Sequence, residues 1–365
     1  MDPIRVRALV GLHVACGGRA GRLLVGRLES ALGPLETWWS RRAAVALPQG
    51  PTPAPAADLR APGLDDQVDR ALAALERCGF TVDGGDAWPA LRALPDPPAA
   101  LFRRGAPWRP GPTLAVVGAR AATAYGVRAV RLLAGAAAEM GALVVSGLAR
   151  GIDAEAHRAA LDAGGATLAV LGAGPDRPYP PEHAALQERI GNEGTLLTEH
   201  LPGVRPLARH FPRRNRLLAA LADAVLLVEA RLKSGSLTTV RWAADLGRDV
   251  LVVPGPIDAP LSEAPIELLR EGATPVACRA HLAEALGLDA GAGEVVAAAD
   301  VADEADPATP HEERLLALAR GAPVDLDALV RLSGEAPSRV LAIVLSLEAR
   351  GRLLREADGR SFRAR

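Results

Sequence analysis

Residues 113–153 read TLAVVGARAATAYGVRAVRLLAGAAAEMGALVVSGLARGID, and this stretch decides the fold. It contains a short apolar run over 113–117, a helical pattern over 125–140 and a second apolar run over 142–145. Two apolar strands joined by a helix are typical of a βαβ unit, in which the strands are parallel and covered on both faces. The stretch therefore predicts an α/β fold.

The same alternation continues toward the C-terminus. We expect further strands at 167–171, 195–198, 224–228 and 250–253, a short last strand near 275–277, and helices at 154–163, 181–190, 213–221 and 237–246. This order predicts a Rossmann-like, doubly wound, mainly parallel sheet. In such a sheet a ligand binds in the crevice outside the carboxyl ends of the strands.

Three regions flank this α/β domain, which we place at 86–288. Residues 1–80 are predicted to form an N-terminal helical domain with a Pro/Ala-rich linker, because prolines over 48–62 exclude a helix or a central strand. Residues 289–308 contain acids but no Lys or Arg, which predicts a solvated linker. Residues 309–365 show three helical patterns followed by a hairpin, which predicts a C-terminal winged-helix domain.

Composition excludes several classes of protein. The 365 residues include 42 Lys and Arg and 43 Asp and Glu, so a uniformly basic nucleic-acid coat is excluded but a local basic patch is not. Three widely spaced cysteines without a CxxC pair argue against a disulfide framework or a zinc cluster. No apolar run is long enough for a membrane span, and His13 interrupts the first apolar stretch, so we expect a cytoplasmic protein rather than a secreted or membrane one.

Several of the expected strands end in glycines, hydroxyls or cations. The first ends in Gly118-Ala119-Arg120, and Arg120 is predicted to point into the crevice. The second ends in Ser146-Gly147, where the backbone can approach a ligand, and Arg150 follows before a helix. Lys233 precedes a further helix, whose N-terminus attracts anions. The pattern favours a site for phosphate groups.

These positions also have structural interpretations. Thr123, Asp153 and Ser236 lie just before helices and would act there as N-caps. Asp153 and His157 share one helical face, so together with Ser146 they permit a nucleophilic triad as a further alternative.

The densest basic segment covers residues 205–216. It contains no acid and five arginines, namely Arg205, Arg209, Arg213, Arg214 and Arg216. Phe211 lies among them and can stack on a base while the guanidinium groups bind phosphates, and Asn215 can bridge backbone groups or contact a base edge. The alternative is that these arginines form structural pairs with Glu199 and Glu229.

Signals for bond chemistry are weak. The seven histidines are scattered without HExxH spacing, no loop carries a pair of carboxylates, and a full GxGxxG is missing. We therefore expect no catalytic residues, no metal and no cofactor.

In order and spacing, residues 86–278 resemble the bacterial DNA-processing protein A (DprA, also called Smf) family. The motifs that carry the resemblance are Gly118-Ala119-Arg120, Ser146 to His157, Tyr179-Pro180, Phe211 to Arg216, Ser234 to Thr239 and Pro254-Gly255. The resemblance implies a single-stranded DNA-binding protein of natural transformation (competence) that protects incoming DNA and loads the recombinase RecA. It also implies a homodimer that is not an enzyme.

The resemblance assigns DNA binding to particular positions, to which the charge pattern adds Arg150 and Arg216. The positions it implies are Arg120, Ser146, Gly147, Phe211, Arg213, Arg214, Asn215 and Lys233.

Two other hypotheses remain open at this point. One is a nucleotide-binding Rossmann-like enzyme such as a phosphoribohydrolase, although such enzymes normally carry a catalytic acid in a Gly-Gly-x-Gly-Thr context that this sequence lacks. The other is that the winged helix, whose charges are mixed, is the part that binds nucleic acid or a protein partner.

Overall fold

The structure is a computed structural model that describes residues 1–18, 21–42, 59, 61–290, 310–320, 323–349, 352–355 and 361–364. The chain forms two compact units, Met1–Val295 and Val296–Arg365. The linkers expected at 48–62 and 289–308 lie largely outside the described residues.

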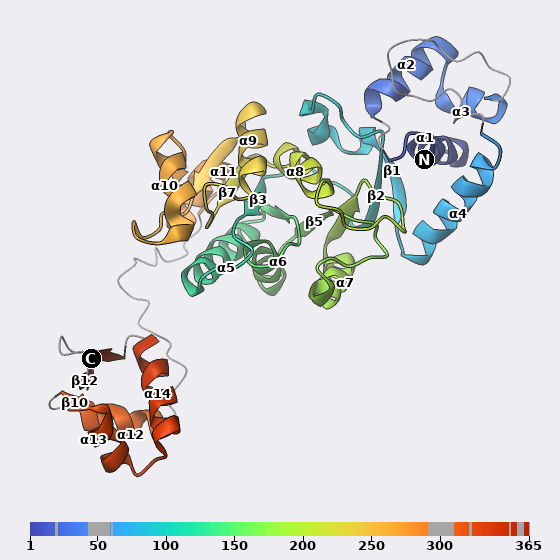
Figure 1. Cartoon of the computed structure of the whole chain (residues 1–365). Helices are drawn as coiled ribbons and strands as arrows, with labels where there is room; N and C mark the ends of the chain where they lie inside the picture. The colour runs from blue at the N-terminus through green and yellow to red at the C-terminus, as the bar shows by residue number, and fades with distance from the viewer. Residues whose placement is uncertain are drawn as a thin grey trace. The chain divides into compact units, whose positions relative to one another are not determined.

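The first unit is built on a nine-stranded sheet (Figure 1) with the order β1-β2-β6-β5-β4-β3-β7-β8-β9. The strands are β1 (Thr81–Gly84), β2 (Ala100–Gly105), β3 (Thr113–Val117), β4 (Leu143–Ser146), β5 (Thr167–Leu171), β6 (Thr195–Thr198), β7 (Ala224–Leu227), β8 (Asp249–Val252) and β9 (Thr274–Pro275). Strands β3 to β9 run parallel, and β2 and β1 extend the β6 edge antiparallel. The predicted Rossmann-like, mainly parallel fold is confirmed.

Helices cover both faces of this sheet because every second residue of a strand points to the same side. Leu114 and Val116 of β3 pack with α5 (Ala124–Glu139) and α6 (Ile152–Asp162). Ala115 and Val117 pack on the opposite face with α8 (His210–Leu221) and α9 (Leu237–Asp245). Figure 1 shows these two helix layers on either side of the strands.

The remaining helices of this part are α7 (Ala184–Glu193), α10 (Glu263–Arg270) and α11 (Arg279–Leu286). Two expected helices differ at their starts. The helix expected from residue 181 begins as a 3-10 turn, Pro181–His183, before α7. Helix α8 begins at His210, three residues earlier than expected, since Pro212 lies in the first turn, where no backbone N–H is needed.

The order of the strands creates one switch point. From β3 the chain builds β4, β5 and β6 in one direction, and then returns to place β7 on the other side of β3. The loops that leave β3 and β7 therefore separate above the sheet. An open α/β sheet binds its ligand at such a point.

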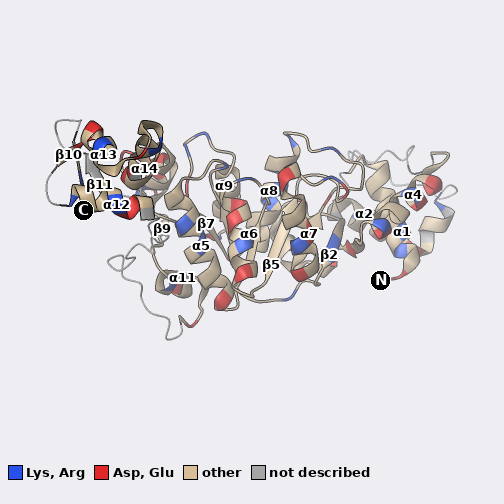
Figure 2. Ribbon diagram, turned by 90° about the horizontal axis from the view of Figure 1, so that it is seen from below, with Lys and Arg blue, Asp and Glu red and all other residues tan. Residues whose placement is uncertain are grey.

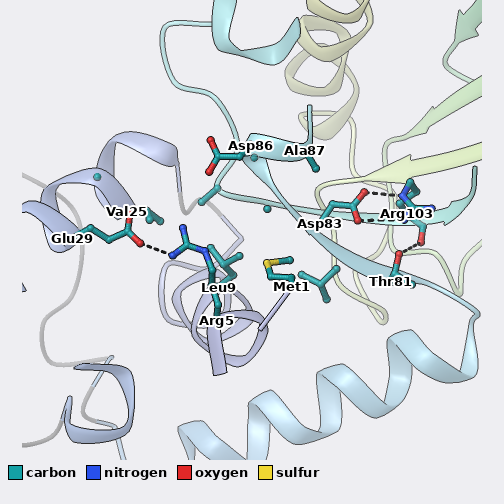
Figure 3. A pocket seen from close by; sticks show the side chains of 15 residues that line it. Met1, Arg5, Leu9, Val25, Glu29, Thr81, Asp83, Asp86, Ala87 and Arg103 are labelled. Carbon is teal, nitrogen blue, oxygen red and sulfur yellow. Dashed lines mark hydrogen bonds and ion pairs between the residues drawn. The ribbon is translucent and has the colours of Figure 1, made fainter. Parts of the chain in front are cut away.

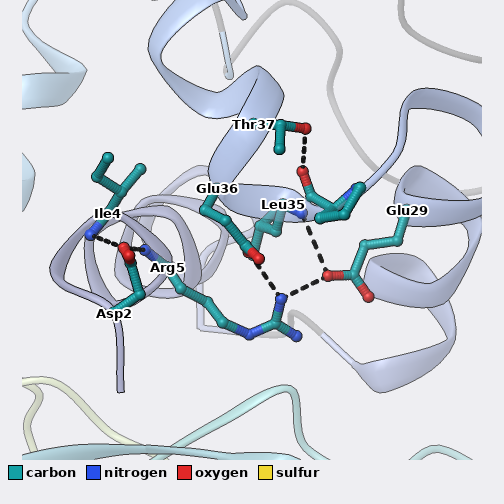
Figure 4. Close-up of polar contacts among 8 residues, drawn as sticks. Asp2, Ile4, Arg5, Glu29, Leu35, Glu36 and Thr37 are labelled. Atoms are coloured by element: carbon teal, nitrogen blue, oxygen red, sulfur yellow. Dashed lines mark hydrogen bonds and ion pairs between the residues drawn. The ribbon is translucent and has the colours of Figure 1, made fainter.

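The described residues before β1 form four α-helices, and the first of them contacts β1 and β2. They are α1 (Pro3–Ala15), α2 (Arg22–Leu32), α3 (Leu35–Trp38) and α4 (Leu64–Arg77). Leu9 and Leu12 of α1 share a core with Phe102 of β2. The Arg5 guanidinium donates to Glu29 at 2.7 Å and to Glu36 at 3.0 Å (Figure 4), which ties α1 to α2 and α3.

The described residues of the second unit form three helices and a small antiparallel sheet. Its elements are α12 (Pro310–Ala319), β10 (Val324–Asp325), α13 (Leu326–Ser333), α14 (Pro337–Ala349), β11 (Leu353–Arg355) and β12 (Ser361–Ala364), with strand order β10-β12-β11. Asp325 caps α13 by accepting from Ala328 N at 2.6 Å. The winged-helix prediction is confirmed, and the sequence reading missed only β10 among these described elements.

Within the described ranges, no helix combines the length and the apolar character that crossing a bilayer requires.

Candidate nucleic-acid interface

A crevice of about 570 Å³ opens at the switch point. Its walls come from the loop after β3, the loop between β7 and α9, the first turns of α8, and Tyr179. Four cationic side chains line it, namely Arg120, Arg214, Arg231 and Lys233, against the single carboxylate of Asp153. On the outer helices, such as α6 and α7, basic and acidic residues are interspersed (Figure 2). The crevice therefore has the positive excess that a polyanion requires.

A larger hollow, of about 690 Å³, lies between α1, α2 and β1 (Figure 3). Its two arginines are already paired, since Arg5 contacts Glu29 at 2.7 Å and Arg103 contacts Asp83 at 2.7 Å. Asp86 adds a further negative charge. Size alone favours this hollow, but its charges are balanced or acidic, so the crevice is the better candidate for an anionic ligand.

An aromatic pair with a cation beside it forms one side of the crevice. The rings of Tyr179 and Phe211 lie 5.3 Å apart between centroids and are tilted by 39°. The Arg120 guanidinium lies 5.8 Å from the Phe211 ring. A Cβ at Gly172 would come within 2.8 Å of that ring, so only glycine leaves room for it. Planar rings beside a guanidinium group can stack an unpaired base.

Arg120 is accessible to a ligand. Its side chain is exposed, and among the residues that the structure describes it forms no ion pair. Lys233 on the opposite wall is likewise exposed and unpaired within those residues. Both cations are therefore available for phosphate groups.

Arg214 has a different place, inside the wall. Its residue is only 5 % exposed, Nη1 donates to the Val170 carbonyl, and Nε donates to Asn215 Oδ1 at 3.2 Å. Burial lowers its pKa to about 10, an effect that the nearby Asp153 charge opposes. A Cβ at Gly147 would overlap the guanidinium, so Gly147 is needed for the arginine to fit. Arg214 thus joins β5, α8 and the loop after β4.

Asn215 and Asp153 also stabilise the crevice wall through hydrogen bonds to backbone groups. Asn215 Nδ2 donates to the Gly235 carbonyl at 3.3 Å, so this side chain bridges α8 to the loop before α9. Asp153 Oδ2 accepts from Gly147 N at 3.2 Å and from Ala149 N at 3.3 Å. The N-cap expected at Asp153 is wrong, because Gly151 occupies the cap position and Asp153 instead holds the preceding loop.

Of the other two expected N-caps, one forms a capping hydrogen bond and one does not. Thr123 is confirmed as the cap of α5, with Oγ1 accepting from Gly126 N at 3.2 Å. Ser236 stands at the N-cap position of α9 without a capping bond from its side chain. Its hydroxyl instead hydrogen-bonds to that of Ser234 at 2.7 Å.

The triad alternative is wrong. Ser146 is fully buried and its hydroxyl donates to the Val116 carbonyl at 2.6 Å. His157 Nδ1 hydrogen-bonds to Thr167 Oγ1 at 2.7 Å, and burial lowers the His157 pKa to about 3. Both side chains are core groups of the sheet.

The remaining candidates lie outside the crevice wall. Arg216 pairs with Glu199, and both side chains are about nine-tenths buried, so the structural alternative is correct for this arginine. Arg150 pairs with Glu182 on the surface. Arg213 is half-buried on α8 and is not among the residues that line the crevice.

The crevice wall therefore contains half of the sequence-predicted residues. Those in the wall are Arg120, Phe211, Arg214, Asn215 and Lys233, and those outside it are Ser146, Gly147, Arg150, Arg213 and Arg216. Tyr179, Arg231 and Thr239 also line the crevice, although the sequence analysis assigned none of them to DNA binding. Arg231 follows a strand end directly, and that position could have revealed it.

Buried neutral histidines should make stability depend on pH. Burial is the main cause that lowers the pKa of His13 to about 4 and of His157 to about 3. These histidines are neutral in the folded protein but protonate below about pH 6.5 in the unfolded chain. Their contribution to the free energy of unfolding is therefore complete above that pH and is lost as pH falls. We expect each to lower the free energy of unfolding by about 2 kcal/mol between pH 7 and pH 5.

Urea denaturation at these two pH values measures the effect. His13→Asn should reduce the pH dependence by about the contribution of one histidine. An unchanged difference between pH 7 and pH 5 in this variant would contradict the assignment.

The chain is similar to known proteins in its sequence. Residues 80–287 match the family described as DNA recombination-mediator protein A, and residues 299–359 match the DprA winged helix domain. A putative DNA processing protein DprA of Mycobacterium tuberculosis is 45 % identical over 254 residues, which cover 67 % of this chain and 63 % of the relative. Protein Smf of Escherichia coli is 40 % identical over 271 residues, which cover 72 % and 71 % of the two chains. The chain thus spans less than two thirds of the mycobacterial relative's length.

Solved structures similar to this one include two of DNA processing protein A. DNA processing protein A of Streptococcus pneumoniae has a TM-score of 0.60 at 32 % identity and covers 77 % of this chain and 95 % of its own. DNA processing protein A of Helicobacter pylori has a TM-score of 0.51 at 29 % identity and covers 57 % and 95 %. The latter structure is described in terms of that protein's single-stranded DNA binding mode.

Proposed function

Because this chain belongs to the DNA recombination-mediator protein A (DprA/Smf) family, we propose that it binds single-stranded DNA in its crevice and processes DNA in natural transformation. The observation that carries the proposal is the excess of four cations over one carboxylate beside an accessible aromatic pair. Cations bind phosphates on any nucleic acid, whereas an aromatic face can stack only a base that is not already stacked in a duplex.

The residues at the crevice divide into two roles. Arg120, Phe211 and Lys233 contact the strand, and Arg150 and Arg213 contact it where it leaves the crevice. The other five act as positioning residues, because their polar groups bond within the protein or, at Gly147, because the Arg214 guanidinium fills the space beside the backbone. They are Ser146, Gly147, Arg214, Asn215 and Arg216.

The wider role rests on the family resemblance. We propose that the protein protects incoming strands, loads the recombinase RecA and acts as a homodimer in the cytoplasm. We also propose that it breaks no bond, since the Asp153 carboxylate in the crevice accepts two backbone N–H groups instead of facing a substrate alone. Its working parts are the helical region 1–80, the DNA-binding domain 86–288, the linker 289–308 and the winged helix 309–365.

The decisive experiment compares fluorescent oligo-dT with a duplex of equal length, each titrated by anisotropy at two salt concentrations. We expect clear preference for oligo-dT, and affinity that falls with salt because bound counterions are released. Equal affinity for the duplex, or affinity independent of salt, would contradict the proposal.

Phe211→Ala should weaken binding of oligo-dT by about 5- to 100-fold, because base–aromatic stacking contributes roughly 1–3 kcal/mol per base. Phe211→Leu keeps an apolar side chain beside Gly172 but has no π-face, so it should lose nearly as much. Phe211→Trp restores the π-face and serves as the control. Wild-type affinity in Phe211→Leu would show that the ring only fills space.

A further inference from the structure

Thr239 has a polar group that the fold leaves unused. It is the third residue of α9, lies in the crevice wall and is 0 % exposed. Its Oγ1 has no hydrogen-bond partner among the residues that the structure describes. A buried hydroxyl left unpaired costs on the order of 1–3 kcal/mol, so such a group calls for a physical explanation.

Hydroxyls and a cation stand next to Thr239 in the crevice lining at the start of α9. Side chains of a helix lean toward its N-terminus, so the Thr239 hydroxyl lies near the positive end of α9. Ser234 and Ser236 hydrogen-bond to each other at 2.7 Å, and one of their two hydroxyl protons remains to be donated. Exposed Lys233 stands beside them, and space is open next to Gly235, where a Cβ would meet nothing within 4 Å.

The backbone N–H groups at the start of α9 already have acceptors within the protein and so offer little to a ligand. The N–H of Ser236 donates to Ser234 Oγ at 3.3 Å, and those of Leu237 and Thr238 donate to turn carbonyls at 3.3 and 3.2 Å. A ligand would therefore be held by hydroxyls, an ammonium group and the helix dipole. An anion with several acceptor oxygens matches this set better than a neutral base edge does.

We propose that Lys233, Ser234, Ser236 and Thr239 form a phosphate subsite, here named the α9 subsite. The inference rests on the proposed function for its ligand, a phosphodiester of the bound strand. The phosphate of a free mononucleotide has the same chemistry, and the experiment separates these two sources.

Thr239→Val is the central test, because valine keeps the shape and removes the hydroxyl. Affinity for a fluorescent 15-residue oligo-dT should fall about three- to ten-fold, as expected for one lost hydrogen bond. The midpoint of thermal unfolding without DNA should stay equal or rise, because an unpaired buried hydroxyl has been removed. Thr238→Val is the matched control, since Thr238 is next in the same helix and does not line the crevice.

The source of the phosphate is found with two further probes. Oligo-dT with one neutral methylphosphonate linkage, moved along the chain, should have one position at which Thr239→Val causes no further loss. Weak binding of dTMP but not thymidine, lost in Thr239→Val, would instead assign the subsite to a free nucleotide. A loss in Thr239→Val that depends on base identity and on no linkage would overturn the phosphate assignment.

Failure of the subsite is distinguishable from failure of the function. If Thr239→Val binds oligo-dT like the Thr238→Val control while Phe211→Ala weakens it, the subsite is wrong and strand binding stands. If the wild-type protein does not bind oligo-dT and neither dTMP nor inorganic phosphate binds, both proposals fall.

Discussion

Replacing Arg214 by methionine is expected to lower the free energy of unfolding by about 3 kcal/mol. The guanidinium is buried and donates to the Val170 carbonyl and to Asn215. Burial raises the pKa of Asp153, and Arg214 is the cation that does most to lower it again. Methionine fills similar space but leaves the carbonyl without its donor and the carboxyl without its counter-charge. The loss is structural, so weaker DNA binding would follow from it.

The dependence on pH makes this prediction specific. Burial raises the pKa of Asp153, and Arg214 counters that rise, so removing Arg214 should raise the pKa further. A carboxyl whose folded pKa lies above its unfolded one destabilises the fold when ionised. The difference in free energy of unfolding between Arg214→Met and wild type should therefore be larger at high pH than at low pH.

Urea denaturation at pH 8 and pH 5 checks the prediction, with Arg213→Met as the matched neighbour. Arg213 is half-buried and has no ion pair in the described part of the chain, so its loss should change stability by less than about 1 kcal/mol. Equal stability of the two variants would contradict the internal role of Arg214.

Charge reversal at 213 and 214 together looks, from the sequence, like a direct test of DNA binding. Successive residues of a helix point about 100° apart, so adjacent arginines face different surroundings. Arg213 is half-buried outside the crevice lining, Arg214 is inside the wall, and Arg216 is paired with Glu199. The composition of the segment was visible in the sequence, but this division depends on how α8 is rotated against the sheet.

The parallel part of the fold was predictable because its strands are buried on both faces and so appear as continuous apolar runs. Strands β3, β5 and β6 were placed at their observed bounds. The antiparallel edge was missed because β1 reads TVDG, with no apolar run, and β2 ends in two arginines. Arg103 is accommodated there by Asp83 at 2.7 Å, a pairing between strands that local sequence does not reveal.

The position of the crevice could be predicted from the sequence, but the residues that line it could not. Glycines and cations at strand ends indicated which edge of the sheet holds the site. Tyr179 reaches Phe211 from a segment 32 residues away, and Thr239 enters the wall from inside a helix. Such contacts arise from packing between α8 and its neighbours, which the spacing of one sequence does not contain.

Arg120→Glu is expected to weaken binding of oligo-dT at least ten-fold at about 0.1 M salt on every sequence. Arg120 is exposed, lies at the switch point beside Phe211 and forms no ion pair among the described residues. Glutamate removes one phosphate contact and adds repulsion. The slope of log affinity against log salt should become shallower by about 0.7, the value for one phosphate on a single strand.

Arg70→Glu is the matched control, because Arg70 is also exposed, lies on α4 and produces the same change in net charge. If affinity responded only to net charge, both variants would lose equally and the crevice would have no special part in binding. If the crevice is the interface, Arg120→Glu loses affinity and salt dependence together, and Arg70→Glu loses little of either. Because screening weakens distant charges beyond about 10 Å at 0.1 M salt, the contrast should persist as salt is raised to that level.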